Sequence, residues 1–561
     1  MDQRGDTGTL RFPDDSEIDG FWGQDRIHAP RPMSPLAFDL ITDTLALGFT
    51  RAHAEYGAPI DMFTRSVNNY LYSSMRPVTD PVEVARRAEL YTDLPRRLDE
   101  VGDLWENEWK PALIRSVRAG RVRDYRGLTN AELAAELERQ RDHMIDQWTV
   151  HGRINFGVVA GARFVDFYQS TFEPDDPSEG YQLLQGFVTQ TVLATQEMWR
   201  LSRRIRASGP LRALFSRPTA EIAATLATAV GNGPDAADFA LRFQAYLDEY
   251  GWRSDAVYDV ADASWREDPS IPIDALRGYA ALDDSQDPEA AFARTVQRRE
   301  ELLTRARARL ADDPERLATF ERYYEAGRHN LPLTEDHAFW IDQSGVVNVR
   351  RFLLQVGERL VADGCLAAPD DVFFLRHHDV TAALLEGGDR RDLAARRRAS
   401  MAAAAVLEAP PTLGVATRPP DGTPMDPLLE AILVRLAGRR PPQPMAEAQT
   451  VLTGHGASAG VATGTARVVR SLAEAAKLDE GDILVCEMTL PPWVPLFALA
   501  GAVVADTGGQ MSHCAIVARE FGIPAVVGTQ VGTRVITDGT TVTVDGSRGE
   551  VHLEPPQTSR H

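Results

Sequence analysis

The run DTGGQMSHCAIVAREFGIPAVVG occupies residues 506–528. The apolar segment AVVA that precedes it is typical of a buried strand, and the two glycines allow a tight turn and close approach of backbone N–H groups to a ligand. Ser512 is a favourable helix N-cap, so we expect a helix from His513 that ends at Gly522. The run therefore predicts a strand, loop, helix and strand of an α/β domain, with His513 in the first helical turn.

Short β-branched segments surround this run and extend the same pattern over residues 447–556. Glycines and turn residues separate them, and two further segments, near 493–500 and 512–521, favour helices. We interpret 447–556 as one compact α/β domain. The expected strands are ARVV (466–469), DILVC (482–486), AVVAD (502–506), AVVG (525–528), TVTVD (541–545) and EVHL (550–553).

The chain before this domain favours helices. Leu302, Leu303, Ala306 and Leu310 form one apolar stripe at helical spacing. Asp80-Pro81 and Thr129-Asn130 are helix start signals, whereas strand-like alternation is scarce. We therefore predict a multi-domain protein: a large, mainly α-helical domain over 1–408, with an irregular lead-in to residue 35, followed by the small α/β domain.

A proline-rich segment, 409–446, lies between the two predicted domains. It holds nine prolines around one apolar segment, LLEAILVRLAG, so it cannot form a continuous helix. We interpret it as a linker that carries a short helix. A surface loop packed against its own domain is the alternative.

Composition excludes several classes of function. The 561 residues carry 60 Lys+Arg against 81 Asp+Glu, a net charge of −21, which disfavours nucleic acid or an anionic membrane as partner. No run approaches about 18 apolar residues, and the N-terminus lacks the apolar core of a signal peptide, so we expect a cytoplasmic protein. The three cysteines form no CxxC pair, and we expect no dedicated metal site.

Histidine at position 513 suits the transfer of a phosphoryl group. Near neutral pH much of an ordinary imidazole is neutral and nucleophilic. The first turn of a helix offers unpaired N–H groups and a positive dipole end to an added anion. A cap or surface histidine is the alternative interpretation of this position.

Residues 488–528 resemble the phosphohistidine swivelling domain of the phosphoenolpyruvate-utilising enzymes, a family that includes phosphoenolpyruvate synthase, rifampin phosphotransferase and phenylphosphate synthase. The resemblance rests on the TGGxxSHxAIVARExGIPAVVG pattern, the PPWVPLF segment and GDIL. It implies that His513 is the phosphorylated residue and that a loop shapes the site around it. That loop comprises Thr507, Gly508, Gly509 and Ser512. Cys514 stands where the family usually has alanine, and we expect no change in chemistry from it.

Two segments of the helical region, 246–269 and 328–375, resemble the acceptor-binding domain of rifampin phosphotransferase. Tyr250-Gly251-Trp252-Arg253 stands where that family tends to have Gly-His-Arg, so Trp252 departs from the pattern. The resemblance implies that residues 1–408 bind an acceptor.

A nucleotide-binding module is not evident in the sequence. There is no GxxxxGK[ST] motif and no glycine-rich strand-turn-strand near the N-terminus, and Lys110, the single lysine of residues 1–440, has the setting of an ordinary helix surface. The arrangement resembles phenylphosphate synthase, which divides its chemistry among subunits. It implies that a separate ATP-grasp protein, binding ATP and Mg²⁺, charges His513 and releases AMP and phosphate.

The resulting hypothesis is a dikinase-type phosphotransferase that passes the phosphoryl group to a hydroxyl of a phenol, an aromatic alcohol or a natural product. We predict His337 as the general base, because it lies among aromatic residues in the better-matching segment. The predicted substrate-binding residues are His28, His151, Arg253, Asp342 and Arg350.

Two alternatives stay open at this point. In the first, the chain is a non-catalytic phosphocarrier or regulatory protein. In the second, it is a self-sufficient antibiotic phosphotransferase whose nucleotide site the sequence does not reveal.

Overall fold

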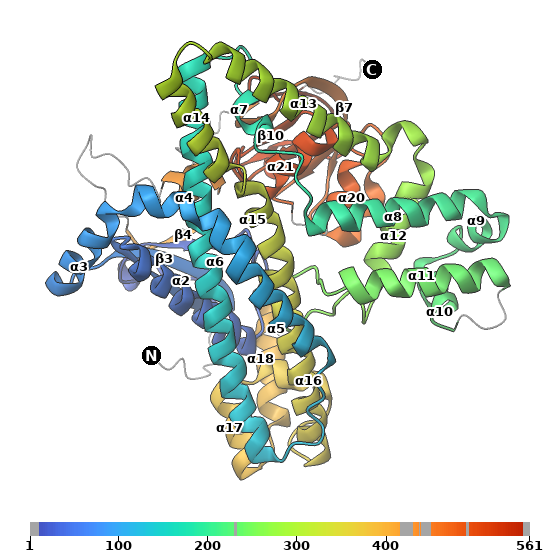
Figure 1. Cartoon of the computed structure of the whole chain (residues 1–561). Helices are drawn as coiled ribbons and strands as arrows, with labels where there is room; N and C mark the ends of the chain where they lie inside the picture. The colour runs from blue at the N-terminus through green and yellow to red at the C-terminus, as the bar shows by residue number, and fades with distance from the viewer. Residues whose placement is uncertain are drawn as a thin grey trace, which may run out of the picture.

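A computed structural model describes residues 10–228, 233–415, 430–436, 438, 450–489 and 493–553. A large helical region carries a small sheet, and an α/β domain built on a larger sheet packs at one end of it (Figure 1). The fold class predicted from the sequence, a large mainly helical domain plus a small α/β domain, is confirmed.

The long helix α6 (Asn130–Phe172) organises the helical region. Thr129 caps its first turn together with Glu132, as the sequence predicts, and its 43 residues span about 65 Å. Helices α2, α4, α14 and α15 pack along it and bury the main apolar core. The helices up to α7 are α1 (Pro35–Ala37), η2 (Phe38–Thr42), α2 (Asp43–Tyr56), α3 (Pro81–Thr92), α4 (Leu94–Leu104), η3 (Trp105–Trp109), α5 (Lys110–Val122) and α7 (Glu179–Gln182), after a short turn η1 (Asp15–Glu17).

A continuous helical stretch returns along α6 and changes pitch in its middle. It comprises α15 (Asn330–His337), the π-helical segment η5 (Ala338–Gly345) and α16 (Val346–Ala362). Hydrogen bonds five residues apart widen η5 and shift the register of the side chains that follow. The neighbouring helices are α13 (Pro288–Arg309), α14 (Pro314–Gly327), η6 (Pro369–Phe374), α17 (His377–Glu386) and α18 (Arg391–Ala404).

A second helical lobe projects from this body and has its own core, which includes Trp199, Phe239 and Tyr279 (Figure 1). Its helix α8 also contacts the α/β domain. The lobe comprises α8 (Gln190–Ala207), α9 (Gly209–Phe215), α10 (Thr219–Thr228), α11 (Pro234–Tyr250) and α12 (Ser270–Ala281), with the short turn η4 (Asp284–Gln286) after it.

A four-stranded antiparallel sheet of order β2-β3-β1-β4 lies near the N-terminus. The sequence did not predict this sheet, because its strands lack a clear alternation of apolar and polar residues. Its strands are β1 (Trp22–Gln24), β2 (Ile60–Val67), β3 (Tyr70–Pro77) and β4 (Thr412–Leu413). Since β4 pairs with β1, the first residues of the predicted linker belong to this sheet. Of the rest, the structure describes chiefly η7 (Ala431–Leu436), which lies in the predicted helical segment.

The α/β domain contains an eight-stranded sheet of order β5-β12-β11-β7-β8-β9-β10-β6. Strands β7 to β10 are parallel, and the outer pairs are antiparallel. Each of the six predicted strands is present, together with β5 and β6, which were not predicted. The elements are β5 (Val451–Thr453), β6 (His455–Ser458), β7 (Val461–Val468), η8 (Leu472–Lys477), β8 (Ile483–Cys486), α20 (Val494–Phe497), β9 (Ala502–Ala505), α21 (His513–Phe521), β10 (Ala525–Val527), α22 (Gly532–Val535), β11 (Thr541–Asp545) and β12 (Glu550–Leu553).

No helix among the described residues is both long enough and apolar enough to cross a lipid bilayer.

Asp506, at the carboxyl end of β9, ties the loop before His513 to the rest of the α/β domain. Its buried carboxylate accepts hydrogen bonds from the Thr529 hydroxyl at 2.9 Å and from the Thr533 backbone N–H at 3.2 Å. The Thr533 hydroxyl donates a further bond. The strand end from which the loop begins is therefore fixed from two later segments.

We expect Asp506→Ala to destabilise the α/β domain by about 2 to 4 kcal/mol, because it leaves buried donors without an acceptor. Hydrogen exchange of the β9 and β10 amides under native conditions measures this change. Asp479→Ala, at a carboxylate that is 82% exposed, is the control and should change protection little. Equal protection in both variants would contradict the role given to Asp506.

Candidate functional site

His513 meets a carboxylate of the helical region. Its Nδ1 lies 2.8 Å from Oε1 and 3.0 Å from Oε2 of Glu335, on α15. Ser512 caps α21 as predicted, accepting a bond from the Ala515 N–H, so His513 is held at the first helical turn. The contact joins residues 178 positions apart in the chain.

This contact determines which ring nitrogen is nucleophilic. A carboxylate beside Nδ1 accepts a hydrogen bond, so Nδ1 carries the proton and the lone pair of the neutral ring lies on Nε2. The Nε2 atom is buried and has no hydrogen-bond partner. A carboxylate on the opposite nitrogen also stabilises the ring when Nε2 gains a positive substituent. The arrangement therefore leaves Nε2 as the nucleophilic atom of the ring.

Glu335 is held rigidly. Its Oε2 accepts a bond of 3.1 Å from the Thr191 hydroxyl on α8. The next residue, Asp336, accepts from the Gln190 N–H at 2.8 Å and pairs with Lys110 Nζ at 2.7 Å. The expectation of an ordinary surface for Lys110 was wrong, because this lysine is largely buried and anchors α15 beside the site.

The predicted loop residues close around the start of α21. Gly508 adopts a φ of +91°, which favours glycine, and the Gly509 N–H donates to the Leu436 carbonyl at 2.8 Å. A Cβ at Gly509 would lie 2.3 Å from the Arg435 carbonyl oxygen, so this glycine permits a close approach to η7. The Thr507 hydroxyl donates to the Glu487 carbonyl at 3.0 Å and thus supports the loop from β8.

Further polar contacts hold the docked α/β domain. Tyr181 donates its hydroxyl to Gln510 Oε1 at 2.7 Å and accepts from Arg435 at 3.2 Å. Arg435 also pairs with Asp166 of α6 at 2.8 Å. Since Arg435 belongs to η7, the linker helix contacts both the His513 loop and the helical region.

Three of the predicted acceptor-site residues form one buried cluster. His151 Nδ1 lies 3.1 Å from Asp342 Oδ1, and His337 Nε2 lies 3.6 Å from Asp342 Oδ2. Burial, together with the nearby His151 ring, lowers the pKa of His337 to about 4, so His337 is neutral at pH 7. Its pKa makes it a weaker base than an ordinary histidine.

His28 borders this cluster. Its ring stacks on Tyr258 with centroids 4.6 Å apart, and its Nδ1 lies 3.1 Å from Asp25 Oδ2. Burial disfavours the charged ring, but the Asp25 carboxylate outweighs this effect and holds the pKa of His28 above its ordinary value. Asp342 acts on His28 in the same direction.

The two predicted arginines differ in availability. Arg350 is bound to Glu267 at 2.9 Å and to the carbonyl of Val260 at 2.8 Å, so it does not join the cluster. Arg253 is 2% exposed, and its Nε and one terminal nitrogen have no hydrogen-bond partner. Its guanidinium lies over the rings of Trp265 and Phe339, and its charge interacts with that of Glu335.

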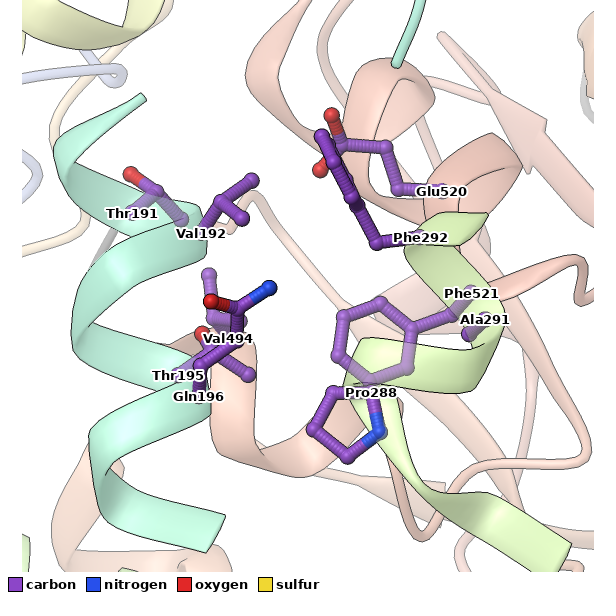
Figure 2. A pocket seen from close by; sticks show the side chains of 10 residues that line it. All are labelled: Thr191, Val192, Thr195, Gln196, Pro288, Ala291, Phe292, Val494, Glu520 and Phe521. Carbon is purple, nitrogen blue, oxygen red and sulfur yellow. The ribbon is translucent and has the colours of Figure 1, made fainter. Parts of the chain in front are cut away.

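A pocket of about 380 Å³ lies where the helical region meets the α/β domain. Figure 2 shows its walls, which come from α8, from α13 and from α20 and α21. Thr191 links it to the site, because the same hydroxyl bonds Glu335. The lining is mostly apolar and comprises Thr191, Val192, Thr195, Gln196, Pro288, Ala291, Phe292, Val494, Glu520 and Phe521.

Comparison with known families agrees with this geometry. Residues 478–549 match the mobile domain of PEP-utilising enzymes, and residues 165–335 match the fourth domain of rifampicin phosphotransferase. The C-terminal domain is thus similar to the mobile domain of the phosphoenolpyruvate-utilising enzymes, and we call it the mobile domain below. The resemblance inferred from the sequence is therefore confirmed, and the fourth-domain match ends at Glu335, the residue that binds His513 of the mobile domain.

Several curated proteins are similar over long stretches. Chondramide synthase cmdD of Chondromyces crocatus is 33% identical over 96% of this chain, and the uncharacterized phosphotransferase YvkC of Bacillus subtilis is 27% identical over 96%. A rifampicin phosphotransferase from Streptomyces sp. is 32% identical over 58%. The chain spans only 14%, 62% and 35% of the lengths of these relatives, respectively.

Sequence reasoning missed Glu335 and the pocket beside the mobile domain. Glu335 lies two residues before His337, in a segment already singled out, but no local pattern shows which side chain will face His513. The pocket combines residues from segments more than 300 positions apart.

Glu520, in the pocket wall, should make the docked structure sensitive to pH. Burial raises the pKa of Glu520 to about 8, and the negative charge of Glu335 acts in the same direction. The folded protein therefore binds a proton that the unfolded chain loses near pH 4.5, and this stabilisation declines as pH rises from about 4.5 to 8.

Glu520→Gln mimics the protonated carboxyl. We expect the stability of this variant relative to the wild type to grow between about pH 4.5 and 8 and to level off above, in thermal unfolding followed across pH. Glu300→Gln, at an exposed carboxylate, should show no such trend. A difference between Glu520→Gln and wild type that does not vary with pH would contradict the burial of this group.

Proposed function

We propose that this chain is a phosphotransferase that carries a phosphoryl group on Nε2 of His513 and passes it to a hydroxyl of a small molecule. The observation that carries the proposal is the contact of Glu335 with Nδ1, which leaves Nε2 with its lone pair. The mobile-domain match and the phosphotransferase names of two relatives support it.

Charging requires the mobile domain to leave the position described above. Nε2 is buried there, so neither a nucleotide nor a phosphoryl group reaches it without displacement of the domain. We propose that a separate ATP-grasp protein supplies the nucleotide site. Nε2 takes one phosphoryl group of ATP, a water molecule takes the other and gives inorganic phosphate, and AMP is released. Mg²⁺ enters with the nucleotide, since it keeps most of its waters and uses few protein ligands.

In the transfer step the acceptor oxygen attacks phosphorus, the P–N bond breaks, and its electron pair returns to Nε2. The hydroxyl proton passes to a base. We favour Glu335 over His337 for this role, because Glu335 touches His513 whereas His337 lies in the cluster with Asp342. Arg253, buried with unpaired N–H groups, would neutralise charge on the phosphoryl oxygens.

The acceptor we propose is a natural product or an aromatic compound with a free hydroxyl. The pocket beside Thr191 is mostly apolar, as is usual for sites that bind such molecules. The similarity to rifampicin phosphotransferase favours a natural product. Phenols and aromatic alcohols remain within this class.

The proposed intermediate is tested with ATP labelled in its β- and γ-phosphates. We expect label on the wild-type chain only when the ATP-grasp partner is present, and its complete loss in His513→Ala. His552→Ala, at a half-exposed histidine of the same domain, should be labelled like the wild type. Labelling of His513→Ala would contradict the assignment, and labelling without the partner would make the chain self-sufficient.

The role of Glu335 is tested separately by Glu335→Gln, which keeps the shape of the side chain. We expect charging of His513 by the partner to persist, while transfer to an acceptor falls by about 10²- to 10⁴-fold. Single-turnover transfer from the charged chain measures this step. Glu325→Gln, at an exposed carboxylate, is the control. Unchanged transfer in Glu335→Gln would remove Glu335 from the mechanism, and a labelled chain that transfers to no acceptor would be a carrier only.

A further inference from the structure

The cluster of His151, His337 and Asp342 has three ligand atoms that converge at one buried point. The nearest of their nitrogen and oxygen atoms all lie within 4.8 Å of one another. The exposed fractions of the residues are 7%, 9% and 4%. Such a convergence of two imidazoles and a carboxylate is costly to bury unless something binds the atoms.

The hydrogen bonds around the cluster leave His337 Nε2 without a donor. His337 Nδ1 lies 2.7 Å from the Leu333 carbonyl oxygen, so Nδ1 carries the proton and donates it. The lone pair on Nε2 therefore faces Asp342 Oδ2, a second acceptor, at 3.6 Å. On the other side of the same carboxylate, His151 Nδ1 lies 3.1 Å from Asp342 Oδ1.

The two nitrogen–oxygen separations are close to those of ligands around one metal ion. Zinc binds imidazole nitrogen and carboxylate oxygen at about 2.0 to 2.2 Å, and tetrahedral angles then place the ligand atoms about 3.3 to 3.6 Å apart. His151 Nδ1 lies 3.1 Å from Asp342 Oδ1, and His337 Nε2 lies 3.6 Å from Asp342 Oδ2. The three ligand atoms lie within 4.8 Å of one another, so binding one ion requires the side chains to close on it.

We propose that His151, His337 and Asp342 bind a divalent transition-metal ion such as Zn²⁺. Two imidazoles and one carboxylate suit zinc or ferrous iron, whereas Mg²⁺ and Ca²⁺ prefer oxygen ligands. Three protein ligands leave at least one position for water or for an oxygen atom of a bound molecule. From the sequence alone we expected no dedicated metal site, and this proposal departs from that expectation.

The fold around the cluster supports this assignment. The π-helical segment η5 carries Asp342 five residues after His337, and its wide turn brings these two side chains together. The bond from His337 to the Leu333 carbonyl is the kind of outer contact that orients a metal-binding histidine. The aromatic rings of Phe49 and Trp148 contact His151 and shield the cluster.

His28 lies beside the cluster. Its ring is 30% exposed, and its charge interacts with that of Asp342. The cluster is distinct from the His513 contact, since Glu335 and His337 project about 160° apart around α15.

The test is a titration of the chelator-treated full-length chain with CoCl₂ and with ZnCl₂. We expect one Co²⁺ per chain with visible absorption bands of nitrogen and oxygen ligation, and loss of these bands when Zn²⁺ is added. Asp342→Asn and His151→Gln should each weaken binding by at least about 100-fold, because they remove a direct ligand. The control is His552→Gln, in an exposed His–Glu pair 3.2 Å apart, which should bind like the wild type.

Wild-type titration decides the matter even if a variant fails to fold. Absence of a stoichiometric Co²⁺ complex in the wild type overturns the proposal, and so does binding that Asp342→Asn leaves unchanged in a folded protein. The charging of His513 is measured in a separate reaction, so failure of the metal site and failure of the phosphotransferase are distinguishable.

Discussion

A contact between a carboxylate and an imidazole joins the helical region to the mobile domain at the candidate site. Glu335 of the helical region meets Nδ1 of His513 in the mobile domain at 2.8 Å, and both groups are largely buried. Burial of this pair is tolerated because the imidazole and the carboxylate hydrogen-bond each other, and the Thr191 hydroxyl donates a further hydrogen bond to the carboxylate. Neighbouring residues hold both sides of this contact in place. Lys110 and Gln190 fix α15, while Ser512 and the loop that contains Gly508 and Gly509 fix the start of α21.

The same contact has a consequence for the proposed mechanism. Nε2 is buried in the described arrangement, so the proposal requires the mobile domain to move when His513 is charged and to return when it delivers the phosphoryl group. The linker helix η7 contacts both the loop before His513 and α6, so it lies between the two parts that the proposed motion would separate. In the proposal a covalent intermediate divides the overall transfer into two steps.

The sequence predicted the elements that short local patterns determine. It missed the contacts between residues that lie far apart in the chain. The caps at Thr129 and Ser512, the helix at His513 and six strands of the α/β domain follow from short patterns, and each is present.

The strand β4 was assigned to the linker because its partner, β1, lies about 390 positions earlier in the chain. Glu335 has no local signature, since its partners Thr191 and His513 lie 144 and 178 positions away in the chain. The sequence made Arg350 a candidate for substrate binding, but in the structure its guanidinium forms an ion pair with Glu267. His151, His337 and Asp342 were selected one by one, and only the π-helical turn shows that they form one site.

The protonation state of one ring tests the central claim most directly. Nitrogen-15 NMR of the chain labelled in its histidines, with the His513 signals assigned by substitution, reports which ring nitrogen carries the proton and which binds phosphorus. The account requires a proton on Nδ1 in the uncharged protein and nitrogen–phosphorus coupling at Nε2 after charging. A proton on Nε2 in the docked protein, or phosphorus bound to Nδ1, would contradict it.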